Sequence, residues 1–155
     1  MKPLAAILLT LCLTAQADPA QRAQEAAAAD VVTTGVGLAL GAAEANPLGL
    51  ALIPLKLIAL DYAAGLSDGE KQTTQHALSA LWTGAASNNL CIIAMLVTGG
   101  MMAPVCVAIG VVTAAHSWQS GSLERDFWMV CASERQTNPK LQCNFKQSWA
   151  SSNPR

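Results

Sequence analysis

Charged side chains are scarce over residues 31–117, and this scarcity limits what the chain can fold into. In this stretch the charged residues are Glu44, Lys56, Asp61, Asp68, Glu70 and Lys71. Charged residues make up 12% of the 155-residue chain, which is about half the share usual in a soluble domain. We therefore expect one small all-α unit, a polytopic membrane protein with three to four helical membrane segments and a short polar C-terminal tail.

The first residues have the organisation of an export signal. Lys2 supplies a short positive region, residues 4–14 supply an apolar core, and Ala15-Gln16-Ala17 forms a cleavage motif. Residues 1–17 are therefore predicted to be a signal peptide. This places the protein in a bacterial inner membrane after export, with an uncleaved first membrane anchor as the alternative.

Prolines and polar runs divide the rest of the chain. A polar lead-in over residues 18–29, expected to be helical and exposed, precedes a helical membrane domain over residues 30–117. Residues 118–155 form a tail that contains tryptophan and cysteine. Within the membrane domain, a hydrophilic loop is expected at residues 67–76, and apolar segments cover residues 31–43, 48–66 and 90–115. The first two apolar segments are short and predict a tight hairpin, with a re-entrant pair as the alternative.

The segment over residues 90–115 is the strongest spanning prediction, because about 20 apolar residues cross the hydrocarbon core of a bilayer. Gly99, Gly100 and Pro104 predict a kink within it, with a turn between two spans as the alternative. These alternatives place the tail on opposite sides of the membrane. Five of the nine Lys and Arg residues lie in the tail, which favours the cytoplasmic side.

Four cysteines follow the predicted signal peptide, and their pairing depends on which side of the membrane the tail occupies. Cys91 and Cys106 would lie about 22 Å apart on one continuous helix, too far to bridge there. Cys131 and Cys143 can form a disulfide if the tail faces an oxidising compartment, and are ordinary thiols if it does not.

One polar helix face is the main candidate site. At 100° per residue, an arc of about 100° contains Asp30, Thr33, Thr34, Gly37, Gly41 and Glu44. Gly37 and Gly41 form a G-x-x-x-G pattern, which permits close packing against another helix. We therefore expect these two glycines to be a helix-packing site.

A chain reversal expected at Asn46-Pro47 brings Lys56 alongside this face. Its ammonium could then reach the threonine hydroxyls or Glu44. Unpartnered polar groups inside a membrane are costly, so three interpretations follow. The groups lock the hairpin, with Asp30 and Glu44 at the water interfaces and Lys56 extended toward solvent. Alternatively, they form a polar pathway or small binding site for an ion, proton or solute, or a face that binds a partner.

The order of these polar residues resembles a family of small bacterial integral membrane proteins. The shared pattern is Asp30-x-x-Thr33-Thr34, then Glu44-x-Asn46-Pro47, then Lys56-Leu57. The resemblance covers roughly residues 30–60, in a family catalogued as a domain of unknown function and typically three-helical. It implies a helical membrane fold and carries no activity with it.

The sequence contains no pattern typical of a catalytic, cofactor or metal site. We therefore expect a non-enzymatic interaction or accessory component of the membrane. Its expected partners are the lipid bilayer and either a second copy or a larger membrane protein. A net charge of −1 indicates no nucleic-acid partner. The alternatives are a small ion or solute pathway through the polar residues, and a phage-type or plasmid-type pore or exclusion protein.

Overall fold

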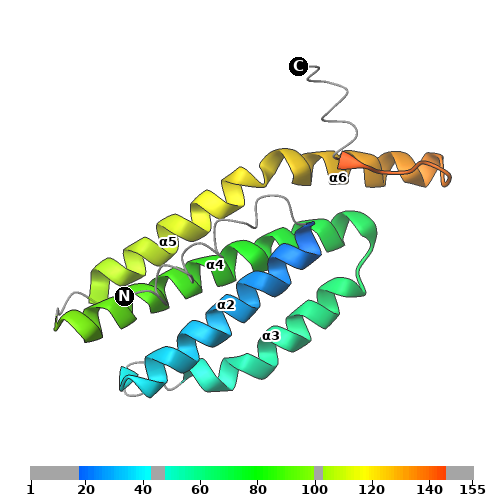
Figure 1. The fold of residues 1–155 in the computed structure, drawn as a ribbon. Helices are drawn as coiled ribbons and strands as arrows, with labels where there is room; N and C mark the ends of the chain where they lie inside the picture. Colours follow the sequence, from blue (N-terminus) through cyan, green and yellow to red (C-terminus); the bar gives the residue numbers. More distant parts are fainter. Residues whose placement is uncertain (1–17, 43–47, 100–102, 146–155) are drawn as a thin grey trace.

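The computed structural model describes residues 18–42, 48–99 and 103–145 (Figure 1). The predicted signal peptide lies outside these ranges, as do Glu44, Asn46 and Trp149. The described part is helical, which confirms the all-α prediction. Its elements are α2 (Pro19–Ala39), α3 (Leu48–Ala64), α4 (Asp68–Thr98), α5 (Ala103–Ser120) and α6 (Ser122–Thr137).

The helices form two hairpins, with α4 at the centre of the molecule. α2 and α5 both pack along α4, whereas α3 makes smaller contacts with α2 and α4. α2 and α4 end, and α3 and α5 begin, at the same end of the molecule (Figure 1). At the opposite end, α6 continues from α5 with a change of direction. We call the end where α2 and α4 finish the turn end, and the end with α6 the base.

Local sequence signals explain where α2 begins and what it buries. Asp18 is the N-cap and accepts a hydrogen bond from the backbone N–H of Gln21 at 3.0 Å, and Pro19 follows at the first helical position. The lead-in was expected to be exposed, but its alanines pack against Trp82 of α4. The buried cluster there consists of Ala23, Ala26, Ala27 and Trp82. Small side chains let α2 approach the indole ring closely.

The hydrophilic loop predicted at residues 67–76 is wrong, because α4 begins at Asp68. Ser67 is the N-cap residue, and its hydroxyl donates to the Glu70 carboxylate at 2.6 Å. The two residues have the Ser-x-x-Glu spacing that is typical of a helix start, although here their side chains bond to each other and not to the backbone N–H groups. The polar residues therefore form the first turns of a helix at the base rather than a loop.

The single span predicted over residues 90–115 is also wrong. Gly99 ends α4 in the left-handed conformation, with φ of 72°, a backbone state that glycine adopts without strain. The chain then reverses into α5, as in the alternative of a turn between two segments. The reversal brings the Cα atoms of Cys91 and Cys106 within 5.3 Å, and the two cysteines form a disulfide. The expectation that they cannot bridge assumed a continuous helix.

The closest helix contact lies between α4 and α5, at two glycines. A Cβ atom at Gly84 would lie 2.6 Å from the carbonyl oxygen of Gly110, so only glycine fits there. Gly37 is buried against ordinary van der Waals neighbours. Gly41 lies beyond α2 with φ of 94° and has no neighbour within 4 Å of a built Cβ. Of the predicted packing pair, Gly41 therefore serves the turn and not the helix contact.

We expect Gly84→Ala to destabilise the fold by about 1–3 kcal/mol, because the added methyl group overpacks the contact between α4 and α5. Gly35→Ala is the matched control, since a Cβ at this helical position meets nothing within 4 Å. That substitution should instead stabilise by about 0.5–1 kcal/mol through a better helix propensity. Chemical denaturation of both variants measures the change in the free energy of unfolding, which should be opposite in sign for the two. Destabilisation of equal size in both would contradict the close contact.

Candidate functional site

A buried ion pair joins α2 to α3. The carboxylate Oδ2 of Asp30 and the ammonium Nζ of Lys56 form a salt bridge. Asp30 is 3% exposed and Lys56 is 8% exposed, so neither group has much access to water. The expected partners of Lys56 were the threonine hydroxyls or Glu44, and the expected place of Asp30 was a water interface. The structure instead pairs the two residues with each other inside the helix contact.

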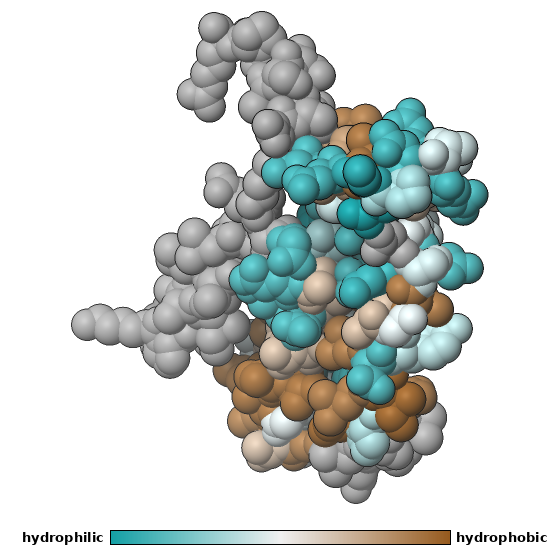
Figure 2. Space-filling model, turned by 90° about the vertical axis from the view of Figure 1, so that its right-hand side faces the viewer, coloured by the Kyte–Doolittle hydropathy of each residue, from teal (hydrophilic) through white to brown (hydrophobic). Residues whose placement is uncertain are grey.

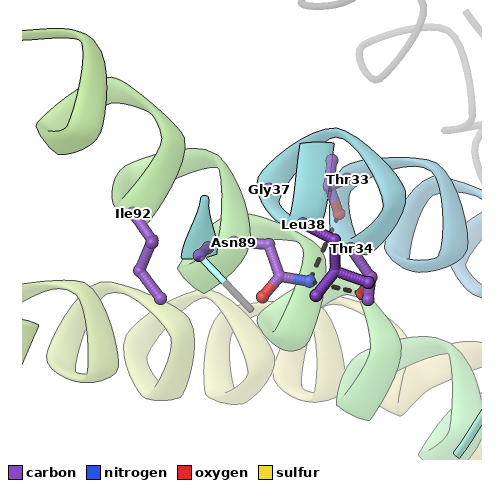
Figure 3. Close-up of a pocket in the computed structure, with 7 residues that line it drawn as sticks. Thr33, Thr34, Gly37, Leu38, Asn89 and Ile92 are labelled. Carbon is purple, nitrogen blue, oxygen red and sulfur yellow. Dashed lines mark hydrogen bonds between the residues drawn. The ribbon is translucent and has the colours of Figure 1, made fainter. Parts of the chain in front are cut away.

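A third helix completes the arrangement through Asn89 of α4. Its side-chain amide donates to Oδ1 of Asp30 at 2.9 Å. The same amide donates to Oγ1 of Thr34 at 3.0 Å (Figure 3). Oγ1 of Thr33 lies 3.4 Å from the same amide nitrogen, and the Thr33 hydroxyl donates to the carbonyl oxygen of Ala29 at 2.9 Å. Asp30 therefore accepts from both neighbouring helices, one contact on each carboxylate oxygen.

Four of the six residues of the predicted polar face form one buried surface of α2, whereas Gly41 is exposed beyond the helix and Glu44 lies outside the described residues. Asp30, Thr33, Thr34 and Gly37 are all buried. Because Asn89 lies opposite them, this face is directed at α4 rather than at solvent or lipid. Its polar atoms are used within the molecule, which agrees best with the interpretation that they lock the helices together.

A small pocket of about 30 Å³ lies beside this network, between α2 and α4. Its lining is Thr33, Thr34, Gly37, Leu38, Ala42, Asn89 and Ile92 (Figure 3). A volume of this size has room for one or two water molecules. Two hydroxyls and one amide give it a polar side, and the remaining lining is apolar.

Sequence reasoning missed Asn89. The apolar segment was expected to begin at residue 90, so Asn89 fell just outside it and received no role in the predicted site. Had α4 been extended back to Asp68, the amide would have fallen in the interior of a long helix. A buried amide in that position needs hydrogen-bond partners. That requirement is the sequence signal that could have indicated a contact between Asn89 and another helix.

A second polar cluster ties the helices together at the base. The guanidinium of Arg22 on α2 forms a salt bridge with Glu124 on α6. His76 of α4 is 5% exposed, and its Nε2 lies 3.8 Å from the Glu124 carboxylate. The same ring packs against Gly121, where a Cβ would lie 2.6 Å from Nδ1. The charged groups of the base thus fix α6 onto α2 and α4.

Cys131 and Cys143 form a disulfide in the structure, with a Cα–Cα distance of 6.0 Å, which is one of the two alternatives that the sequence left open. It fastens the chain after α6 back onto that helix. Phe127 and Phe145 support the same reversal, with ring centres 5.4 Å apart in an edge-to-face arrangement. The described part of the tail after α5 therefore consists of α6 and a following non-helical segment that the disulfide holds against this helix.

Comparisons of the chain with protein-family models, with curated proteins and with solved structures found no match. Within the described ranges, no group of three or more His, Cys, Asp and Glu residues is placed to hold a metal ion. The role of the network between α2, α3 and α4 is therefore inferred from its residues and their contacts.

Lys56→Met should destabilise the protein by about 3–5 kcal/mol, because it leaves the Asp30 carboxylate buried without its counter-ion. The double variant Asp30→Asn/Lys56→Met should recover much of this loss, since it removes both charges. Lys140→Met removes an exposed lysine and should change stability by less than about 0.5 kcal/mol. Denaturation of the four proteins tests this, and a loss in the double variant at least as large as that in Lys56→Met would contradict the coupling.

Proposed function

We propose that the protein is a non-enzymatic interaction or accessory component of a membrane, whose contact surface is an exposed apolar belt. Large contiguous apolar surfaces on folded proteins mark contacts with partners or membranes. At least 41% of each belt side chain is exposed. The belt consists of Val32, Val36, Leu40, Leu52, Leu55, Leu57, Ile58, Leu96, Val97, Val105, Val107, Ile109, Val111 and Val112.

The position of the belt is the observation that carries the proposal. Its residues come from the second half of α2, from α3, from the end of α4 and from the first half of α5. These parts lie toward the turn end (Figure 1). Figure 2 shows hydrophobic side chains gathered in the lower part of the molecule and hydrophilic ones over the upper part, where α6 lies. Exposed apolar side chains are therefore concentrated toward the turn end, as expected for a molecule between water and lipid. Nearer the base, the exposed apolar residues are Tyr62, Leu81, Leu123, Met129 and Val130.

The membrane segments of this proposal are α2 to α5, which corresponds to the upper count of three to four expected from the sequence. By length and composition, one helix of the described residues is long and apolar enough to cross a membrane, over Gly69–Thr98. The predicted export signal supports a bacterial inner membrane. The two disulfides support export as well, because disulfides persist in oxidising compartments.

Contact with a second copy or a larger membrane protein would also use the belt. The Gly37 face first expected to bind a partner is already occupied by α4. In the proposed arrangement, this face assembles the molecule and the belt meets its surroundings.

A polar pathway is the second candidate function. The pocket beside Thr33, Thr34 and Asn89 supports it, because hydroxyls and an amide suit an ion or a water molecule. The mutual neutralisation of Asp30 and Lys56 favours the interaction component over the pathway. A pore or exclusion protein has only the chain length and the signal in its favour.

Flotation with lipid vesicles tests the proposal. We expect the wild type to float, and Val112→Glu to bind about a hundredfold more weakly, because a charge placed in hydrocarbon costs about 3 kcal/mol. Gln119→Glu is the matched control, since it adds the same charge to the same exposed face of α5 seven residues nearer the base. Its binding should be unchanged. A wild type that stays with the soluble fraction, or equal losses in both variants, would contradict membrane binding through the belt.

A further inference from the structure

We propose that Cys91, Met95 and Cys106 form a soft-metal site, which binds copper(I) when the disulfide between the two cysteines is reduced. The three residues lie at the contact between α4 and α5. Their sulfur atoms take no part in the network around Asp30. Copper(I) binding is a further function, and it does not depend on attachment to a membrane.

The three sulfur atoms meet at one point of the contact between α4 and α5. Cys91 and Met95 are four residues apart on α4, so their side chains lie on one face of this helix. Cys106 of α5 lies opposite and forms the disulfide with Cys91. The Sδ atom of Met95 lies 2.9 Å from the Sγ atom of Cys106. Two cysteine sulfurs and one thioether sulfur are thus already in contact.

A glycine contact next to the cysteines holds the two helices in register. Gly110 lies one turn after Cys106 on α5. A Cβ atom at Gly110 would lie 2.9 Å from the carbonyl oxygen of Gly84 and 3.0 Å from the Cβ atom of Asn88. Asn88 precedes Cys91 by three residues on α4. This packing keeps the two cysteines opposite each other, with their Cα atoms 5.3 Å apart, when the bond between them is opened.

The burial of the three residues gives the direction from which an ion enters. Cys106 is fully buried, with 0% of its surface exposed. Cys91 and Met95 are half-buried. An ion therefore reaches the Cys106 sulfur from the side on which Cys91 and Met95 lie.

The ligand types select copper(I). Thiolates and thioethers are soft ligands, and this combination is typical of copper(I) sites. Structural zinc sites take four ligands from Cys, His, Asp and Glu, and the described ranges place no group of three or more such residues to hold a metal. The two cysteines alone would leave zinc with half of its ligands, whereas the Met95 thioether gives copper(I) a third sulfur.

The site opens by exchange with a dithiol reductant. The dithiol transfers two electrons and two protons to the disulfide, becomes a disulfide itself and leaves Cys91 and Cys106 as thiols. Copper(I) then binds both cysteine sulfurs and displaces the two thiol protons into water. Met95 donates a sulfur lone pair and loses no proton, and the copper ion stays in the +1 state. Because the disulfide is the stable form in an oxidising compartment, the redox state of the cysteine pair decides whether copper is bound.

Copper(I) binding to the full-length protein tests the inference. The protein with Cys12→Ser serves as the background; it is reduced with dithiothreitol, freed of the reductant under nitrogen and titrated with copper(I) in competition with bicinchoninate. We expect the reduced background to bind one more copper ion per chain than the variant Cys91→Ser/Cys106→Ser, which keeps the tail cysteines. The oxidised background should bind no copper at this site.

Met95→Leu removes the thioether and nearly conserves the volume of the side chain. It should weaken binding of the additional copper ion by about tenfold or more, since even partners outside the ligand shell contribute about tenfold to metal affinity. Met129→Leu is the matched control, because Met129 is an exposed methionine of α6 and its loss should leave the affinity unchanged. X-ray absorption by the bound copper should show three sulfur ligands in the background protein and two after Met95→Leu.

Two results would overturn the inference. One is an equal copper content in the background protein and in Cys91→Ser/Cys106→Ser, and the other is an equal affinity of Met95→Leu and Met129→Leu. Circular dichroism of each reduced protein is the control for folding. Met95→Leu keeps both cysteines, so it decides the question even if the double serine variant loses helix. Flotation tests the membrane proposal separately, and either proposal can fail alone.

Discussion

The buried ion pair between Asp30 and Lys56 is the interaction on which the rest of the structure depends. An unpartnered charge in this interior would be costly, so each residue requires the other in place. Asn89 adds a requirement from α4, because its amide needs the Asp30 and Thr34 oxygens. These contacts fix the positions of α2, α3 and α4 along and around their axes relative to one another. The remaining core consists largely of alanine and glycine contacts, which permit close approach but specify register weakly.

The sequence predicted the parts of this arrangement that follow from local pattern. The all-α fold, the α2–α3 hairpin and the single face containing Asp30, Thr33, Thr34 and Gly37 could all be anticipated. The tail disulfide could be anticipated only as one of two alternatives. The partner of Lys56 could not, because it depends on the relative depth of two helices. That depth is set by where α4 lies, and α4 was predicted to begin some twenty residues too late in the chain.

The wrong predictions for residues 67–76 and 90–115 share one physical cause. Residues 67–76 were expected to be a loop because they are hydrophilic, yet a helix at a wet end of a molecule can be polar throughout its first turns. Residues 90–115 were expected to be one helix because they are uncharged. However, Gly99 ends the helix in a left-handed backbone conformation, which glycine adopts without strain. Hydropathy describes the surroundings of a segment, whereas capping residues decide where it begins and ends. Here the capping residues decided the topology, and with it the pairing of Cys91 with Cys106.

The resulting molecule is polar at its base and apolar at its turn end, and the depth of each residue in a bilayer is the quantity that tests this most directly. Nitroxide labels on one face of α5, at Val105, Ile109, Val112, His116 and Gln119, can be compared for collision with oxygen and with a water-soluble nickel complex. We expect the ratio of oxygen to nickel collisions to be higher at Val105, Ile109 and Val112 than at His116 and Gln119. A flat, water-like profile, or a ratio as high at Gln119 as at Val105, would contradict contact between the apolar belt and lipid.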